Sequence, residues 1–514
     1  MWRRSCTAHA RAISCALVVV VVSALALGRA SDVVADASST TCATTDANGV
    51  CQQRYRLGMC TCVKDEGRWL KAWMEWHLLV GVEHFFLYDD GSTDDTLDII
   101  HEYVDKGVAT FMGASEVYLR DSDKPKHKIR DHLVHCYEHV GPHLDWMMFL
   151  DPDEFIFPID SYDVDNPMCS LAEFLDARCP EDQTHVMARW QMFGSNGYDR
   201  HPAGSLPETH FWSGGACDRL SQGGGKGCET ENFSYTSAHC GECRHTKVIA
   251  NTGRCLQDGS YGESERGQHW PYNLEEGDPG AAAVAERGCR RGWIVGEETE
   301  LDAPVSCAMA AKNPTVDNYH DLIHQHWLMR PRPHHRYARK CCSGGLGLYH
   351  YAVKSEEAME WRKARGARNV DHTGREKRAL RELNGRFSPH ALRFVRALQE
   401  RIGLEHSNPR LTFHDVPRKA DDDKVACSLH EGLKITGGVV VKPKKRRAKA
   451  ATDDVETREA CCELCTATLH CQVFRWSREE GCVMMKEGRT ADSLLGYAHV
   501  EEYTSGVVVV NECE

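Results

Sequence analysis

The chain lacks an excess of basic residues. Its 514 residues include 62 lysines and arginines against 75 aspartates and glutamates, which gives a formal net charge of −13. Nonspecific binding to nucleic acid requires a positively charged face. The composition therefore argues against nucleic acid as a partner.

Glycine-rich phosphate loops are also missing. There is no Walker sequence, and no Gly-x-Gly-x-x-Gly follows the first predicted strand at 57–63. These loops hold nucleotide phosphates in P-loop and dinucleotide-binding proteins. Both classes are poor matches, and any bound nucleotide needs its phosphates neutralised by other groups.

Cysteine, by contrast, is abundant, with 25 residues. Such density indicates disulfides and an oxidising compartment. Arg3, Arg4 and Arg11 precede an uncharged run at 12–28, as in a secretory signal. Residues 1–30 are either a cleaved signal peptide or a type II single-pass anchor. Both alternatives place the rest of the chain in the secretory lumen, with a flexible stem at 31–55.

Short apolar runs alternate with segments of helical spacing from residue 56 onward. Strands are predicted at 57–63, 84–88, 108–112 and 147–150, and helices at 69–78, from a Ser92/Asp95 capping box to 104, and at 126–139. This alternation is typical of a doubly wound, mostly parallel α/β sheet with flanking helices. We expect one domain over 56–415, with helical patterning at 355–404 and a linker at 417–424.

Residues 213–310 interrupt this rhythm. They contain glycine runs and six cysteines between Cys217 and Cys289. We interpret them as a disulfide-stapled, loop-rich insertion. His239, Cys240, Cys243 and His245 resemble a zinc site, although disulfides are favoured in an oxidising lumen.

Carboxylates follow three of the predicted strands directly: Asp65 and Glu66, Asp89 and Asp90, and Asp151 and Asp153. The carboxyl ends of parallel strands meet at one edge of a sheet, where ligands bind. Clustered carboxylates there need a compensating cation, and Mg²⁺ or Mn²⁺ shared with a diphosphate supplies it. The alternative is that these residues cap helices and form turns.

Several ordered blocks resemble glycosyltransferase family 92, which is related to family 2 and has the GT-A fold. The blocks are Cys62–Glu66, Glu75–Val82, Tyr88–Thr96, Phe149–Phe155, Trp190–Tyr198 and His350–Gly366. The resemblance implies a hexosyltransferase that moves a sugar from a UDP-sugar to a glycan or glycoprotein acceptor in the Golgi or secretory pathway.

The resemblance also implies roles for single residues. Asp151 and Asp153, with His350, would hold Mn²⁺ (or Mg²⁺). The donor would be bound by Asp65, Glu66, Asp89, Asp90, Asp151, Lys247 and Lys354.

Members of this family invert configuration, so a carboxylate should act as the general base on the acceptor hydroxyl. Glu208 and Asp199 follow the Trp190–Tyr198 block and are the candidates. The alternative is that both are ordinary loop carboxylates. The insertion at 213–310 has no counterpart in the family pattern, and acceptor-binding loops vary most within a family. The resemblance therefore does not identify the acceptor-binding residues.

The C-terminal segment, 425–514, contains seven cysteines, which suits a small domain that depends on disulfides. The spacing Cys461-Cys462-x-x-Cys465, Cys471, Cys482 resembles a PAN/apple domain, a small α+β fold that binds carbohydrate or protein. The resemblance implies that a helix near 459–466 is tied to a sheet and that Cys427 pairs with Cys513. The basic run 442–447 is either an anion-binding patch or a solvated loop.

Two function hypotheses follow. The first is a lumenal, metal-dependent, inverting glycosyltransferase. The second is a secreted or surface recognition protein that binds glycan or protein and carries a catalytically inactive transferase-like domain. A third hypothesis, the least favoured, is a zinc-dependent hydrolase that uses the Cys and His residues of the insertion.

Overall fold

The computed structural model describes residues 55–113, 132–133, 135–158, 170–178, 185–213, 246–252, 292–295, 303–305, 346–364, 384–416, 425–442, 455–486 and 495–510. Residues 55–514 form one compact unit. The predictions for the signal or anchor, the stem, the linker at 417–424, the zinc-like cluster and Cys513 lie outside these residues. Within them, none of the helices has the length and apolar character required to cross a membrane.

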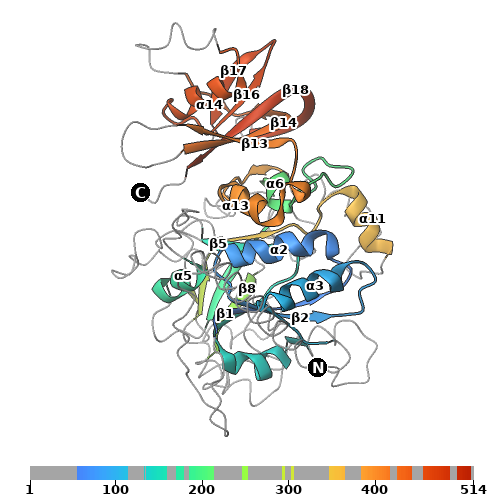
Figure 1. Cartoon of the computed structure of the whole chain (residues 1–514). Helices are drawn as coiled ribbons and strands as arrows, with labels where there is room; N and C mark the ends of the chain where they lie inside the picture. Colours follow the sequence, from blue (N-terminus) through green and yellow to red (C-terminus); the bar gives the residue numbers. More distant parts are fainter. Residues whose placement is uncertain are drawn as a thin grey trace, which may run out of the picture. The chain divides into compact units, whose positions relative to one another are not determined.

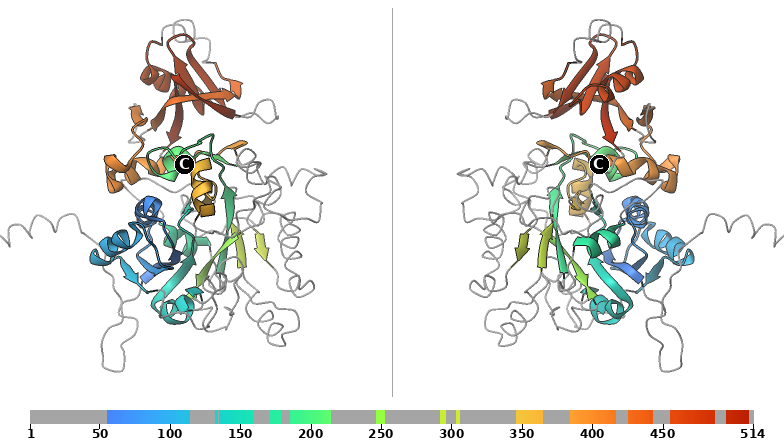
Figure 2. Two further views of the ribbon diagram at one scale, coloured as in Figure 1. Left: turned by 90° about the vertical axis from the view of Figure 1, so that its right-hand side faces the viewer. Right: turned by 90° about the vertical axis from the view of Figure 1, so that its left-hand side faces the viewer.

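The first half of the unit is a parallel α/β arrangement. Strands β1 (Tyr55–Val63), β2 (His84–Asp89), β3 (Ala109–Phe111) and β4 (Leu144–Phe149) pair in the order β3-β2-β1-β4, all parallel. Helices α2 (Gly67–Leu79) and α3 (Thr96–Asp105) lie beside each other over β1 and β2 (Figures 1 and 2). The parallel sheet predicted for this region is confirmed.

Helix α2 is buried along most of its length because its tryptophans recur at helical spacing. The indole N–H of Trp73 donates to Glu154 O at 2.8 Å, and that of Trp76 donates to Ile156 O at 3.0 Å. These bonds fix α2 to β5 (Glu154–Pro158), the strand that follows the Asp-Pro-Asp-Glu turn. The predicted Ser92 capping box is wrong: α3 begins at Thr96, and Ser92 bonds to Asp89 instead.

The second half of the sheet is mixed, so the mostly parallel sheet that the sequence predicted also contains antiparallel strands. Strand β8 (Thr246–Asn251) lies between β4 and β6 (His185–Met192) and is antiparallel to both. Strand β9 (Gly292–Val295) pairs with β6, and β10 (Ala303–Val305) pairs with β9. Residues 213–310 therefore supply β8, β9 and β10 to the central sheet and are not only a loop-rich insertion.

A strand pair completes the sheet beside β6. Strand β11 (Leu346–His350) pairs parallel with β6 and antiparallel with β5. Helix α5 (Leu171–Arg178) and the short helix α6 (Leu206–Thr209) belong to the same region. A π-helical turn at Cys136–Val140 is joined to β1 by the disulfide Cys60–Cys136 and is followed by a 3-10 turn at Gly141–His143.

In the parts of the predicted helical stretch 355–404 that the structure describes, there are two helices. Helix α11 spans Glu356–Ala364 and α13 spans Leu392–Ile402, and between them β12 (Arg386–Phe387) pairs with β7 (Trp212–Ser213). A 3-10 turn, Leu404–His406, follows α13. Single-sequence periodicity does not resolve a short strand between two helices.

In the residues that the structure describes, the C-terminal module is one helix on an antiparallel sheet, as expected. Its strands β13 (Leu411–Val416), β14 (Val425–Gly437), β15 (Val439–Val440), β16 (Val473–Ser477), β17 (Gly481–Lys486) and β18 (Leu495–Val510) pair in the order β13-β14-β18-β16-β17-β15. Helix α14 (Arg458–Thr466) packs on this sheet (Figure 2). The identification as a PAN/apple domain stays a prediction.

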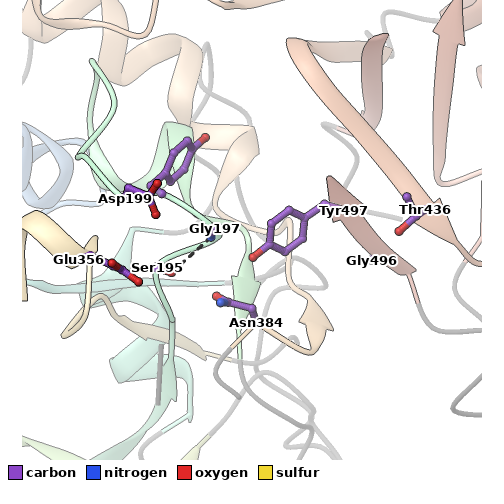
Figure 3. Close-up of a pocket in the computed structure, with 9 residues that line it drawn as sticks. Ser195, Gly197, Asp199, Glu356, Asn384, Thr436, Gly496 and Tyr497 are labelled. Carbon is purple, nitrogen blue, oxygen red and sulfur yellow. Dashed lines mark hydrogen bonds between the residues drawn. The ribbon is translucent and has the colours of Figure 1, made fainter. Parts of the chain in front are cut away.

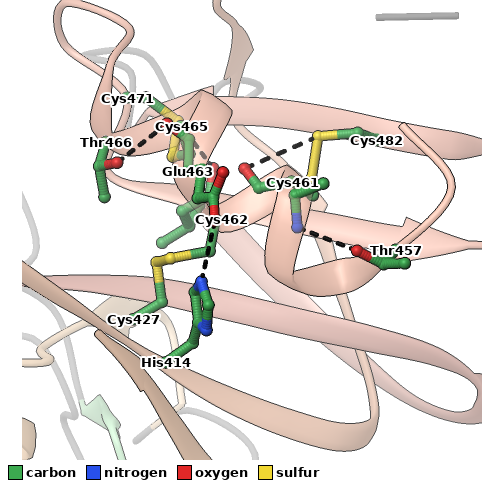
Figure 4. The surroundings of a disulfide bond; sticks show 12 residues. His414, Cys427, Thr457, Cys461, Cys462, Glu463, Cys465, Thr466, Cys471 and Cys482 are labelled. Carbon is green, nitrogen blue, oxygen red and sulfur yellow. Dashed lines mark hydrogen bonds and ion pairs between the residues drawn. A yellow bond between two sulfur atoms is a disulfide. The ribbon is translucent and has the colours of Figure 1, made fainter. Parts of the chain in front are cut away.

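Three disulfides hold α14 in place (Figure 4). Cys461 pairs with Cys482 on β17, Cys462 pairs with Cys427 on β14, and Cys465 pairs with Cys471. The helix is thus tied to the sheet, as the resemblance implied. The implied Cys427–Cys513 pairing is wrong, because two adjacent helical cysteines face different strands and Cys462 takes Cys427.

Candidate active site

The three acidic clusters meet at one edge of the sheet. In the parallel pairing of β1 with β2, Val63 lies opposite Asp89, and in that of β1 with β4, Cys60 lies opposite Phe149. Asp65 and Glu66, Asp89 and Asp90, and Asp151 and Asp153 therefore follow their strands at the same level. This is the edge at which parallel α/β sheets bind ligands.

Asp153 lies between two basic side chains. Its carboxylate is 3.0 Å from Lys354 Nζ and 3.4 Å from His350 Nε2. The pairing of β5 with β11 brings them together, with Glu154 opposite His350 and the Tyr351 N–H donating to Asp153 O at 2.8 Å. Burial alone raises the pKa of Asp153, but Lys354 and His350 outweigh it and hold this pKa well below its usual range. Asp153 is therefore a carboxylate at neutral pH.

Lys354 is held in an unusual backbone conformation. Its φ is +59°, in the left-handed region that side chains other than glycine avoid. The carbonyl of Lys354 accepts a 2.6 Å hydrogen bond from His210 Nε2, and the ammonium lies 4.9 Å from the Trp69 ring centroid. The strained residue is thus fixed at both ends and aimed at Asp153.

A second lysine compensates the other two carboxylates. Lys247, on β8, is fully buried, with Nζ 2.9 Å from Asp151 and 3.1 Å from Glu154. Glu154 is also fully buried, and one oxygen accepts the Asp151 N–H at 2.9 Å. Burial raises the pKa of Glu154 to about 7, with Lys247 opposing and Asp151 reinforcing the rise. Sequence reasoning missed Glu154, although it is the last residue of the Asp-Pro-Asp-Glu turn.

Two of the predicted donor-binding carboxylates support the local turn. Asp65 accepts from the Thr93 N–H at 2.7 Å, and Asp89 accepts from the N–H groups of Gly91 and Ser92 at 2.9 and 3.0 Å. These bonds shape the loop before α3, as the alternative of turn-forming carboxylates predicts. A further role of Asp65 and Asp89 in donor binding stays a prediction.

Glu66 and Asp90 flank the same loop. Glu66 is buried, and its N–H donates to Thr96 Oγ1 at 2.8 Å. The carbonyl of Asp90 accepts from Lys64 Nζ at 2.7 Å, while the Asp90 residue remains partly exposed. Both residues lie at the edge predicted for the nucleoside.

The structure separates the two candidates for the general base. Glu208 is fully buried; its carboxylate accepts from the Ser205 N–H, from Gln399 Nε2 at 2.8 Å and from the Asn408 N–H at 3.0 Å. A residue with these bonds holds α6 in place and has no surface toward an acceptor. Asp199 is exposed, and its carbonyl accepts the Glu357 N–H at 2.9 Å.

The donor set suits a divalent ion only in part. Within the described ranges, no group of three or more His, Cys, Asp or Glu side chains is arranged as a metal site. Asp153 and His350 offer one oxygen and one nitrogen 3.4 Å apart, a combination that Mn²⁺ accepts. Asp151, the remaining predicted ligand, is paired with Lys247.

Residues 55–208 match the model of Glycosyltransferase family 92. A family 92 protein of Ricinus communis is 30% identical over 105 residues, which is 20% of this chain and 17% of that protein. One of Oryza sativa subsp. japonica is 25% identical over 114 residues, 21% and 17% of the two chains. The matches thus span about a sixth of these relatives. The Asp-Pro-Asp-Glu turn lies within the segment that matches the family 92 model.

Solved structures show weaker likeness. Staphylococcus aureus TarS 1–349 in complex with UDP has a TM-score of 0.26 and 12% identity, covering 47% of this chain and 57% of TarS. Glucosyl-3-phosphoglycerate synthase from Mycobacterium tuberculosis, in complex with Mn²⁺, UDP and phosphoglyceric acid, has a TM-score of 0.18 and 13% identity, covering 26% and 43%. Scores this low do not establish a common fold.

Proposed function

We propose that the chain is a metal-dependent glycosyltransferase with a GT-A-type domain that takes its sugar from a UDP-sugar. The family 92 match over residues 55–208 supports the reaction class. The observation that carries the proposal is the Asp153 carboxylate, buried at the ligand-binding edge between Lys354 and His350. An ionised buried carboxylate with two basic neighbours is a typical feature of a functional site.

Asp153 and His350 would hold Mn²⁺ or Mg²⁺, with Asp151 beside them. When bound, the ion would stabilise the negative charge that develops on the diphosphate leaving group. Lys354 adds a second positive charge at the same place, because its ammonium is only 3.0 Å from Asp153. Lys247 keeps Asp151 oriented and neutralises Glu154.

We assign the role of general base on the acceptor hydroxyl to Asp199. The acceptor hydroxyl oxygen attacks the anomeric carbon of the donor sugar as the bond from that carbon to the diphosphate breaks. The hydroxyl proton passes to the Asp199 carboxylate, which is exposed. Such an attack from the opposite side of the sugar inverts the configuration.

Turnover of a UDP-sugar tests this proposal. We expect the full chain to hydrolyse or transfer from at least one UDP-sugar only with Mn²⁺ or Mg²⁺ present. Asp153→Asn should lower the rate on the order of 100-fold. Asp105→Asn, which neutralises an exposed carboxylate at the end of α3, should retain full activity. Full activity in Asp153→Asn would refute the metal assignment.

A second function is favoured by one observation. Lysines already neutralise both aspartates of the motif, Asp151 through Lys247 and Asp153 through Lys354, as in a domain that has become a scaffold. The alternative is therefore a secreted or surface protein in which the C-terminal module binds glycan or protein. Calorimetry separates the two, because a scaffold would bind neither Mn²⁺ nor UDP.

The compartment we propose is the lumen of the secretory pathway. The disulfides Cys60–Cys136, Cys427–Cys462, Cys461–Cys482 and Cys465–Cys471 support this location, because disulfides persist in oxidising compartments. An alkylation assay on protein isolated from its native cells checks it. These eight cysteines should react only after reduction.

A further inference from the structure

A pocket distinct from the Asp153 cluster lies where the loop after β6 meets the C-terminal module. Its volume is about 470 Å³. Asp199 and Glu356 line it from the α/β region, and Thr436 and Tyr497 line it from strands β14 and β18 of the module (Figure 3). Both parts of the chain are therefore required to form its walls.

Close packing fixes the two walls against each other. Gly197 has φ +77°, and a Cβ at this position would lie 3.1 Å from the Tyr497 ring. His499 Nε2 bonds to the Asn196 carbonyl at 3.0 Å, and the rings of Trp212 and Tyr497 lie 4.5 Å apart. The pocket is thus preformed, as ligand sites usually are.

The chemistry of the lining selects a polyhydroxylated ligand without negative charge. The carboxylates of Asp199 and Glu356 and the hydroxyls of Thr436 and Tyr497 make no hydrogen bond to any residue that the structure describes. Carboxylates accept from sugar hydroxyls, and tyrosine offers an apolar ring together with a polar tip. Among the lining residues that the structure describes, none is a lysine, arginine or histidine, so the two carboxylates repel an anionic sugar.

The pocket is connected to the Asp153 cluster through a very short stretch of chain. Lys354, which contacts Asp153, and Glu356, which lines the pocket, are two residues apart, so their Cα atoms are separated by at most about 7 Å. The Glu357 N–H also donates to the carbonyl of Asp199 at 2.9 Å. A ligand in the pocket therefore lies close to the proposed donor site.

We propose that this pocket binds a neutral or amino-bearing sugar unit of the acceptor, so that the C-terminal module takes part in acceptor selection. The inference rests on the proposed glycosyltransferase function and adds the chemical class of the acceptor. The C-terminal module would then contact the acceptor next to the site of sugar transfer, in addition to any ligand that it binds on its outer surface.

Binding of defined oligosaccharides to the full chain tests this inference. The probes are three sets of soluble oligosaccharides, neutral, amino-bearing and anionic, measured by saturation-transfer NMR and then by calorimetry. We expect binding within the first two sets only. Tyr497→Phe, which keeps the ring packing, and Glu356→Gln should each weaken it about tenfold, the loss of one hydrogen bond.

Matched controls lie on the same elements. Tyr503→Phe removes a hydroxyl from β18 that bonds to Lys434 outside the pocket, and Glu360→Gln removes an exposed carboxylate from α11. Both should leave oligosaccharide affinity unchanged. Preference for the anionic set, absence of binding in all sets, or equal affinity in the pocket variants and the controls would overturn the inference.

Binding of UDP with Mn²⁺, measured on the same wild-type preparation, tests the proposed function separately. If UDP does not bind but oligosaccharide binding depends on Tyr497, the transferase function is rejected and the sugar-binding pocket is retained. If UDP binds but oligosaccharide affinity does not depend on Tyr497 or Glu356, the pocket is rejected and the transferase function is retained.

Discussion

At the scale of single residues, one buried lysine supports much of the acidic edge. Lys247 compensates both Asp151 and Glu154, and neither Lys247 nor Glu154 is exposed to solvent. The sequence resemblance pointed to Lys247 as a donor-binding residue. The structure adds that Lys247 also neutralises Glu154, a buried glutamate that was not selected from sequence.

Lys247→Met should destabilise the fold by about 3 kcal/mol, because it leaves a buried carboxylate without its cation. The double variant Lys247→Met/Glu154→Gln should recover most of the lost stability, since the remaining partner of Lys247, Asp151, is partly exposed. Urea unfolding of the three proteins measures both steps. A double variant no more stable than Lys247→Met would contradict the assigned pairing.

His210 predicts how stability changes with pH. Burial lowers its pKa from 6.5 to about 4. Below pH 6.5 the unfolded chain therefore binds a proton that the folded chain does not, and stability falls until the pH reaches about 4. Lowering the pH from 7 to 5 should therefore reduce the free energy of unfolding by about 2 kcal/mol through His210. The loss should be about 2 kcal/mol smaller in His210→Gln than in wild type, measured by urea midpoints at both pH values. Four other buried histidines whose pKa values burial lowers contribute the same loss to both proteins: His77, His84, His201 and His430. Equal losses in wild type and His210→Gln would count against the prediction.

At the scale of elements, β8 decides how the site is assembled. It joins the parallel half of the sheet to β6 and carries Lys247 to the end of β4. Its sequence, Thr-Lys-Val-Ile-Ala-Asn, suits a strand. The cysteines and glycines around it led to the expectation of a loop-rich insertion, since a short strand that pairs far along the chain has no local signature.

Ile249→Pro should unfold the domain or cost more than about 3 kcal/mol, because proline removes a ladder hydrogen bond from a central strand. Val440→Pro is the matched control, since Val440 is 56% exposed on the edge strand β15. Thermal melts of both variants give the comparison. Similar small shifts in the two melting temperatures would show that β8 is not a central strand.

At the scale of the whole unit, an aromatic cluster joins the C-terminal module to the α/β region. Phe211, Trp212 and Phe387 pack with Leu433 and Ile435 in one buried cluster, and the partly buried Tyr497 packs against it. The sequence predicted two separate domains joined by a linker at 417–424. It could not predict this cluster, because contacts between residues far apart in sequence depend on the complete fold.

The shared cluster predicts that residues 55–514 unfold in one cooperative transition. Trp212→Ala should lower stability by about 3–5 kcal/mol, the usual cost of emptying a buried aromatic position, and should separate the transition of the module from that of the α/β region. Scanning calorimetry detects both effects. Two resolved transitions in the wild-type chain would show that the cluster does not couple the parts.

The sequence predicted the parts of the site that depend on local order. Strand ends followed by acidic residues placed Asp65, Asp89 and Asp151 at one sheet edge, and the register of β1 with β2 and β4 agrees. Burial and long-range pairing could not be predicted. In the structure, Glu208 and Glu154 are fully buried. Asp151 and Asp153 of the Asp-Pro-Asp-Glu turn are each paired with a lysine.

The most direct test of the central claim is a calorimetric titration of UDP into the full chain, with and without Mn²⁺, for wild type and Asp153→Asn. The claim predicts that wild type binds UDP only when Mn²⁺ is present and that Asp153→Asn does not bind under either condition. UDP affinity that is the same without Mn²⁺ and in Asp153→Asn would contradict it.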